Sequence, residues 1–181
     1  MTTKTASAAP PAPPKMPTSA DKQLLDFALS AELSVHDLYV NAINSGMLSA
    51  DEKIMMEMFS DHHKSYAQSL NGLLGKAASN TRNEALYSTY VGQLTSAQAM
   101  NRVLQSVENT MVATHTDILS SLEGLDGATL VASIITVEAR HAAVFGTLPS
   151  SSLSNALNSA ASSLAPNAAP AAVTTETTVA P

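Results

Sequence analysis

Apolar residues recur every three or four positions over four stretches of the chain, which is the spacing of amphipathic helices. The stretches run from about residue 19 or 20 to 45, from 49 to about 74, from about 96 to 122, and from about 128 to 147. Ser19 or Asp21 can cap the first stretch, and Ser49 with Glu52 forms a capping box before the second. Sustained two-residue alternation, the sign of a strand, is missing from the sequence. The pattern therefore predicts an all-α fold.

The lengths of the connections predict how the four helices are arranged. Short turns at Gly46 and between Gly124 and Gly127 join the helices in pairs, so each pair should form an antiparallel hairpin. Residues 76–95 join the two pairs, with a helical turn or two expected around Asn83–Tyr90. A linker of this size can cross the full length of a helix of about 25 residues. The prediction is an antiparallel four-helix bundle with one long crossover between two helical hairpins.

Acidic and imidazole side chains interrupt the apolar stripe of each predicted helix. At about 100° per residue, each of them projects among side chains that face the core. A charged group in such a place costs several kcal/mol unless something compensates it. The interruptions on all four helices indicate one shared partner, and a metal ion is the simplest candidate. The interrupting residues are Glu32, His62, Glu108 and Glu138, with His141 one turn after the last.

Their spacing places these residues at one height in the predicted bundle. Glu32 lies 15 residues before Met47 in the first turn, and His62 lies 15 residues after it. Glu108 lies 17 residues before Leu125 in the second turn, and Glu138 lies 13 residues after it. The two members of each pair are 30 residues apart in both hairpins. The polar residues should therefore form one layer across the bundle.

Composition narrows the choice of metal and of partner. The chain has no cysteine, so a metal would be held by oxygen and nitrogen ligands. A net charge of -6 and the lack of a Lys/Arg cluster argue against a nucleic-acid partner. The sequence has no run of 18 or more uncharged apolar residues, which predicts no membrane span. The first twenty residues lack the apolar segment of a signal peptide.

Segments rich in Pro, Ala, Ser and Thr flank the predicted bundle. Residues 1–19 and 150–181 cannot bury enough apolar surface to offset the entropy of ordering, which predicts largely disordered tails around a folded domain of residues 20–149. Within the second tail, Leu153–Leu164 is a candidate for a short helix against the bundle. Tails of this composition resemble extracytoplasmic linkers, which favours the cell envelope over the cytoplasm.

The chain resembles the ferritin-like superfamily, in particular the bacterial ferritin-like domain proteins whose last helix carries Glu-x-x-His. That motif stands here as Glu138-Ala139-Arg140-His141, in ITVEARHAAVF. The glutamate of the family's first helix is matched by Glu32 in LLDFALSAELSVHDLY, and that of its third helix by Glu108 in LQSVENTMVATH. The resemblance covers about residues 20–148. It implies a di-iron carboxylate centre and, if the protein is an enzyme, ferroxidase-type oxidation of Fe(II) by oxygen or peroxide.

The second predicted helix departs from the family pattern, which has Glu-x-x-His there as well. At that spacing His62 follows Phe59 and His63 follows Ser60, so a bridging glutamate is missing. The spacing instead puts His62 where that glutamate would be expected. A site of this kind suits one or two ions of iron, manganese or zinc. The proposed ligands are Glu32, His62, Glu108, Glu138 and His141, with His63, His36 and His115 as further candidates.

Two functions are compatible with these observations. The first is a ferritin-like metal-binding protein, with iron as the preferred metal, in iron handling or oxidative-stress protection. The second is a non-catalytic helical bundle that serves as a structural or interaction module of the cell envelope. In that alternative, Glu32 and Glu108 form buried ion pairs with His62 and His141. Metal ions are the expected partners, and assembly into a homo-oligomer is left open.

Overall fold

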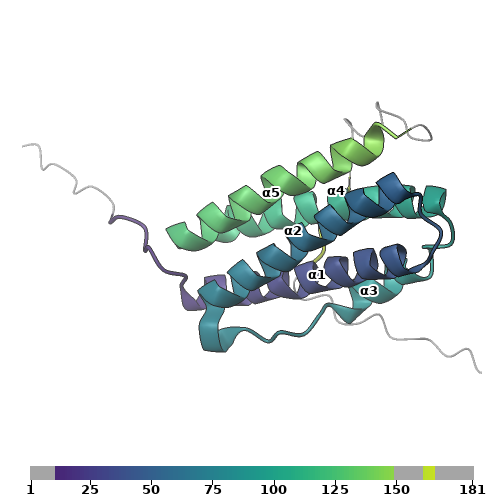
Figure 1. Ribbon diagram of the computed structural model, residues 1–181. Coiled ribbons are helices and arrows are strands. Elements are labelled where there is room, and N and C mark those ends of the chain that lie inside the picture. Colours follow the sequence, from purple (N-terminus) through teal and green to yellow (C-terminus); the bar gives the residue numbers. More distant parts are fainter. Residues whose placement is uncertain (1–10, 149–160, 166–181) are drawn as a thin grey trace, which may run out of the picture.

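The structure, a computed structural model, describes residues 11–148 and 161–165, and most of them lie in five α-helices. The long helices are α1 (Ser19–Asn44), α2 (Ala50–Leu74), α4 (Ala97–Ser121) and α5 (Leu125–Gly146). α1 packs along α2, and α4 along α5, as antiparallel hairpins that lie side by side (Figure 1). A 3₁₀ turn, η1 (Gly75–Ala77), and the short helix α3 (Glu84–Val91) lie in the crossover. The all-α bundle of two hairpins with a long crossover is therefore confirmed.

Capping boxes start both helices of the first hairpin. Ser49 caps α2 and Thr18 caps α1, and in each case the third helical residue bonds back to the cap. The box predicted at Ser49 with Glu52 is confirmed. The cap predicted for α1 was wrong by one residue or more, because Thr18 takes the role assigned to Ser19 or Asp21. Asp21 is instead the third helical residue, whose carboxylate accepts a hydrogen bond from the N–H of Thr18.

The carboxylate of Asp21 also links the two hairpins. It accepts hydrogen bonds from the backbone N–H groups of Glu123 and Gly124, at 2.9 Å each, in the turn between α4 and α5. Burial by itself would raise the pKa of this carboxyl group, but the hydrogen bonds from these backbone groups and from Thr18 lower it below its usual value. The fold therefore stabilises the charged form of Asp21.

The start of α5 is held by the N-terminal segment of the chain. The first N–H groups of the helix, those of Leu125 and Asp126, donate to the carbonyl oxygens of Pro14 and Lys15 at 3.0 Å each. With this support α5 begins at Leu125, three residues before the predicted start at Ala128. Pro14 and Lys15 belong to the predicted N-terminal tail, so this part of that segment contacts the bundle.

The hydrophobic core consists of two clusters, one toward each end of the bundle. Along α2 and α5, buried polar residues lie between the positions that belong to one cluster and those that belong to the other. The core is thus divided by a polar layer. The first cluster includes Val35, Tyr39, Met56, Phe59, Leu104, Met111 and Phe145, and the second includes Leu25, Leu29, Leu70, Ile118, Val131 and Ile134.

α2 presents a different face to the core from the one that its apolar pattern predicts. Helical spacing around His62 predicts a core-facing stripe of Met55, Met58, Phe59, His62, Tyr66 and Leu73. The buried residues are Met56, Phe59, Ser60, His63, Ala67, Leu70 and Leu74. The side chain of Met58 is 52% exposed. Small residues on the buried face let neighbouring helices approach closely, and the helix is rotated by about one residue, or about 100°, from the prediction.

Residues 161–165 lie against the bundle. The N–H of Leu164 donates to Thr114 Oγ1 on α4 at 3.0 Å, and the Leu164 side chain packs against the first core cluster. Within the helix predicted for Leu153–Leu164, residues 161–164 are not helical. The remainder of that predicted helix lies outside the described residues.

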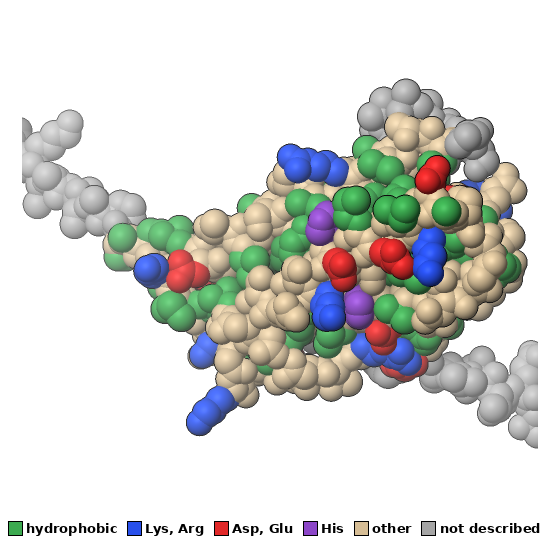
Figure 2. Space-filling model, viewed as in Figure 1, with side chains coloured by type: hydrophobic (Ala, Val, Ile, Leu, Met, Phe, Trp, Pro, Cys, Tyr) green, Lys and Arg blue, Asp and Glu red, His purple; other side chains and the backbone are tan. Residues whose placement is uncertain are grey.

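Helix α5 is long and apolar enough to cross a membrane, judged by length and composition alone. Its inner face is nevertheless occupied by Glu138 and His141, which are buried in the bundle. On the face shown in Figure 2, hydrophobic side chains alternate with polar ones, and charges of both signs are scattered among them. A single helix of this kind is weak evidence for a membrane protein, so the absence of a span stays a prediction.

Candidate metal centre

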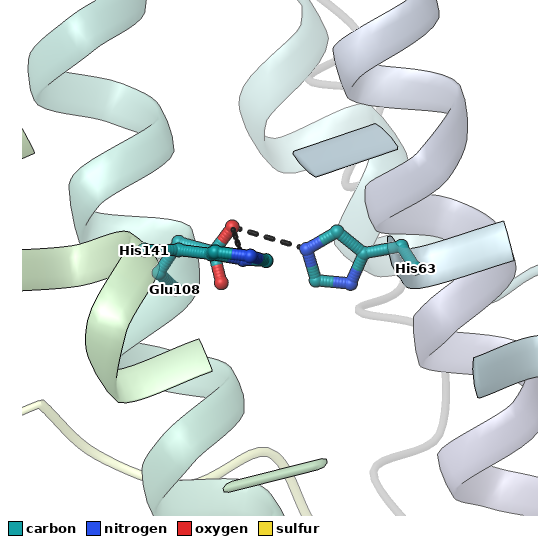
Figure 3. A group of neighbouring side chains, drawn as sticks. All are labelled: His63, Glu108 and His141. Carbon is teal, nitrogen blue, oxygen red and sulfur yellow. Dashed lines mark hydrogen bonds and ion pairs between the residues drawn. The ribbon is translucent and has the colours of Figure 1, made fainter. Parts of the chain in front are cut away.

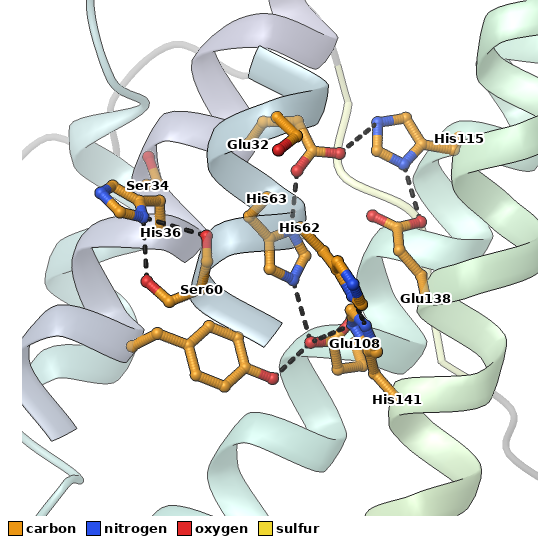
Figure 4. Close-up of polar contacts among 12 residues, drawn as sticks. Glu32, Ser34, His36, Ser60, His62, His63, Glu108, His115, Glu138 and His141 are labelled. Atoms are coloured by element: carbon orange, nitrogen blue, oxygen red, sulfur yellow. Dashed lines mark hydrogen bonds and ion pairs between the residues drawn. The ribbon is translucent and has the colours of Figure 1, made fainter. Parts of the chain in front are cut away.

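Glutamate and histidine side chains from all four long helices meet at the centre of the bundle (Figure 4). All of them except His62 are buried, with at most 2% of the side chain exposed. They occupy one layer, at the height that their spacing in the sequence indicates. α1 provides Glu32, α2 provides His62 and His63, α4 provides Glu108 and His115, and α5 provides Glu138 and His141.

A first group in this layer consists of His63, Glu108 and His141 (Figure 3). Oε1 of Glu108 lies 3.0 Å from Nε2 of His63 and 3.3 Å from Nδ1 of His141. The phenol of Tyr39 donates a hydrogen bond to the same oxygen. One ligand atom from each of the three residues lies within 4.8 Å of the other two. The group is therefore compact enough to hold one ion.

A second group lies on the other side of the His63 ring. Nδ1 of His63 is 2.7 Å from Oε2 of Glu32, and ligand atoms of Glu32, His63 and Glu138 lie within 4.8 Å of one another. His115 completes this side, with Nδ1 2.9 Å from Oε2 of Glu138 and Nε2 3.6 Å from Oε1 of Glu32. His63 thus belongs to both groups, with one ring nitrogen directed toward each.

His62 lies at the edge of the layer, half-buried. Its Nδ1 is 2.9 Å from Nε2 of His141, and the two ring planes are within 4° of each other. In such a contact one nitrogen donates and the other accepts. Burial, His141 and His63 together lower the pKa of His62.

His36 lies outside the layer, where its Nδ1 shares hydrogen bonds with the carbonyl and hydroxyl of Ser60 (Figure 4).

Charge is distributed unevenly over the layer. Burial opposes ionisation of every group in it. The carboxylates of Glu108 and Glu32 nevertheless raise the pKa of His63 well above its usual value, and His63 and His141 lower the pKa of Glu108 to about 2. For Glu138 burial prevails over the nearby His115, and its pKa is raised to about 7. In the metal-free protein at neutral pH, His63 and Glu108 are therefore charged, and Glu138 is only partly ionised.

The sequence was compared with the profiles of known protein families. The sequence profile of a family described as "ferritin-like domain" matches residues 20–151. The chain belongs to this family. Searches of the curated proteins and of the solved structures found no match to this chain. The matched residues include every residue of the polar layer and all of the four long helices except Ser19, the first residue of α1.

Unpaired polar atoms show whether the ferritin-like domain could hold a metal ion. Five buried atoms of the layer make no hydrogen bond with the residues that the structure describes: Glu32 Oε1, Glu108 Oε2, Glu138 Oε1, His115 Nε2 and His141 Nδ1. The two nitrogens have only ion-pair contacts, His141 with Glu108 at 3.3 Å and His115 with Glu32 at 3.6 Å. Each unpaired buried group costs about 1–3 kcal/mol. A cation bound by carboxylate oxygens and imidazole nitrogens would satisfy them together. Such a donor set suits iron, manganese or zinc, so the residues present fit a metal ion.

The structure brings four of the five proposed ligands into the buried layer and changes the roles of the histidines. Glu32, Glu108, Glu138 and His141 are buried there, whereas His62 lies at the edge. His63 and His115, which were predicted only as further candidates, are fully buried in the layer, and His115 contacts the carboxylate of Glu138. His36 takes no part in the layer.

Helical spacing in the sequence indicates that His63 and His115 face the core. His63 continues the series of Met56, Ser60 and Ala67, which is a helical stripe that contains small as well as apolar residues. His115 follows Glu108 by seven residues, or two helical turns, and therefore projects from the same face of α4.

Proposed function

We propose that this ferritin-like protein binds transition-metal ions, iron foremost, in the polar layer, and that it serves iron handling or oxidative-stress protection. The observation that supports this best is the set of five buried, unpaired acceptor or ligand atoms at the centre of the bundle. Three carboxylates supply the hard oxygen ligands that iron and manganese prefer, and the imidazoles add nitrogen ligands that also suit zinc.

The chain's own residues would position and shield the ion. Hydrogen bonds from Tyr39 and His63 orient Glu108, and His62 orients His141. The two apolar clusters above and below the layer exclude water from it. Bound iron would supply one-electron redox chemistry with oxygen or peroxide. His62, as the most exposed member of the layer, is the residue nearest to solvent.

Thermal melts of chelator-treated protein test the proposal. Anaerobic addition of Fe(II), Mn(II) or Zn(II) should raise the melting temperature, because the ion binds only the folded state. When the free metal is at 100 times its dissociation constant, the unfolding free energy should increase by about 2.7 kcal/mol. Glu138→Gln should reduce the shift strongly. Glu57→Gln, the same change at an exposed position of α2, should leave it intact. A wild-type melting temperature that responds to none of the three metals would refute the proposal.

The alternative function, a non-catalytic bundle module, is favoured by one observation. His63 already forms ion pairs with Glu32 at 2.7 Å and with Glu108 at 3.0 Å, so part of the buried charge is compensated without a metal. If the polar layer serves only to form these ion pairs, the melting temperature should not change when metal is added. Removal of either partner should then destabilise the protein equally in the presence and absence of metal.

A further inference from the structure

The two groups of potential ligands share one residue, His63. Its Nδ1 lies 2.7 Å from a Glu32 oxygen and its Nε2 lies 3.0 Å from a Glu108 oxygen, so both ring nitrogens face a carboxylate. The ring is fully buried and therefore held in one orientation. Figure 4 shows Glu32 and Glu108 on opposite sides of this ring.

The unpaired atoms divide between the same two sides. Glu32 Oε1, Glu138 Oε1 and His115 Nε2 belong to the side of His63 Nδ1, and Glu108 Oε2 and His141 Nδ1 belong to the side of His63 Nε2. The side of Nδ1 thus has two carboxylates and the side of Nε2 has one, and each side has a further histidine of its own and one nitrogen of His63. Two separate sets of ligands explain this division better than one.

We propose that His63 bridges two divalent metal ions, one on each ring nitrogen, and replaces the carboxylate bridge that α2 lacks. This inference rests on the proposed metal-binding function. One ion is held by Glu32, Glu138, His115 and Nδ1 of His63, and the other by Glu108, His141 and Nε2 of His63. Any proton on Nδ1 or Nε2 of His63 leaves to solvent as the two metal–nitrogen bonds form, and the ring becomes an imidazolate.

Charge balance supports the bridge. Two divalent ions bring four positive charges into a buried layer, and Glu32, Glu108 and Glu138 bring three negative ones. An imidazolate at His63 supplies the fourth, so that the filled site is neutral. A neutral imidazole would leave a net positive charge in the core, which is costly.

The bridge also determines how far apart the ions lie. With metal–nitrogen bonds of about 2.0–2.1 Å on either side of one imidazole ring, the two metals are about 6 Å apart. In two-metal sites in which the ions share oxygen ligands, they are about 3.5–4 Å apart. Two ions bridged by the His63 ring bind different nitrogen atoms and would share no ligand atom.

Copper(II) is a suitable probe, because it binds nitrogen and oxygen sites tightly and its unpaired electron reports coupling. The wild-type protein should bind two Cu(II) per chain. Electron paramagnetic resonance should lose most of its intensity on cooling to liquid-helium temperature, since an imidazolate couples the two spins antiparallel. Replacing one copper with Zn(II) should restore an ordinary single-copper signal.

Two variants frame this experiment. His63→Gln cannot bridge, so it should bind fewer ions or show two uncoupled copper signals. His36→Gln changes a half-buried histidine outside the layer and should behave like the wild type. If His63→Gln does not fold, the metal–metal distance in the wild type, from X-ray absorption or a crystal structure of the zinc-loaded protein, still decides the question, with about 6 Å expected.

The outcomes separate this inference from the function on which it rests. Failure to bind copper, zinc or iron at all would refute the metal-binding function. One ion per chain, two ions without coupling, or a separation of about 3.5–4 Å would overturn the bridge and leave metal binding intact. Coupled ions that persist in His63→Gln would likewise overturn it.

Discussion

The two hairpins contribute to the same polar layer, but their sequences predict it unequally well. In the second hairpin, Glu108 and Glu138 are 30 residues apart and both are buried where the apolar stripes of α4 and α5 place them. In the first hairpin, Glu32 is buried as expected, but His62, at the same spacing, gives way to His63. Matched spacing therefore predicts the height of a residue in a bundle more reliably than it predicts the rotation of its helix.

The reason lies in the side chains that flank each polar position. On α5 the two polar residues themselves leave one choice of face, because Glu138 and His141 are about one helical turn apart and lie in line with the buried residues Ile134 and Phe145. On α2, by contrast, either member of several pairs of adjacent residues could face the core. These pairs include Met55 and Met56, His62 and His63, and Tyr66 and Ala67. Packing against the other helices chooses between such faces, and it favoured the stripe with smaller residues.

Substitution of the two adjacent histidines of α2 should give the largest difference. His63→Leu leaves the buried carboxylates of Glu32 and Glu108 without their cationic partner, so the metal-free protein should lose about 3–5 kcal/mol of unfolding free energy. His62→Leu removes one hydrogen bond at the edge and should cost about 1 kcal/mol. Urea denaturation of both variants measures the difference. Equal losses would contradict the central position of His63.

Two glutamates of the second hairpin should respond in opposite ways to the same substitution. Glu108→Gln removes a charge that His63 compensates and should destabilise the metal-free protein by about 1–3 kcal/mol. Glu138→Gln removes a carboxylate whose ionisation burial disfavours, so the metal-free protein should be as stable as the wild type or more so. Both variants should bind metal more weakly. Denaturation curves with and without metal test this, and a loss of stability in both metal-free variants would argue against the uneven charge distribution.

The pH dependence of the metal-free protein should reflect the same groups. His63 has a raised pKa in the fold, so its contribution to stability is complete below about pH 6.5 and is lost as pH rises through the folded-state pKa. The raised pKa of Glu138, about 7, acts in the same direction. Glu108, with a pKa of about 2, contributes above about pH 4.5, and this contribution is lost as pH falls.

Melting temperatures of metal-free protein between pH 3 and 9 should therefore be highest near about pH 4.5–5 and should decline on both sides. His63→Gln should remove much of the decline on the alkaline side. A wild-type melting temperature that keeps rising to pH 9 would show that other groups control the pH dependence.

The smallest expected effect concerns how the two hairpins are held at their ends. Removal of residues 1–13 should leave stability unchanged, because the hydrogen bonds to the start of α5 come from Pro14 and Lys15. Removal of residues 1–15 deletes both bonds and should cost about 1–3 kcal/mol. Hydrogen exchange should then increase at Leu125 and Asp126 but stay unchanged at the start of α2, where Ser49 is the cap. Equal exchange in both truncated chains would show that this contact contributes nothing.

Much of the candidate site could be predicted from the sequence because it depends on local rules. Glu32, Glu108, Glu138 and His141 each lie in an apolar stripe, and helical periodicity is enough to place them inside. The same rules located the Ser49 box and the two hairpin turns. The contact of Pro14 and Lys15 with α5 was missed because it joins segments about 110 residues apart and leaves no local pattern.

The sequence by itself determined the helices, their pairing and the height of the polar layer, because periodicity, caps and linker length act over short ranges. Only the tertiary structure decided which nitrogen atoms occupy the centre. His62 and His63 are neighbours in the chain, and either could face inward on an isolated helix. α2 packs against α1 and α5 with the small side chains of Ser60 and Ala67 on its buried face, and this orientation turns His63 toward Glu32 and Glu108. That rotation places both ring nitrogens of one histidine between two carboxylates.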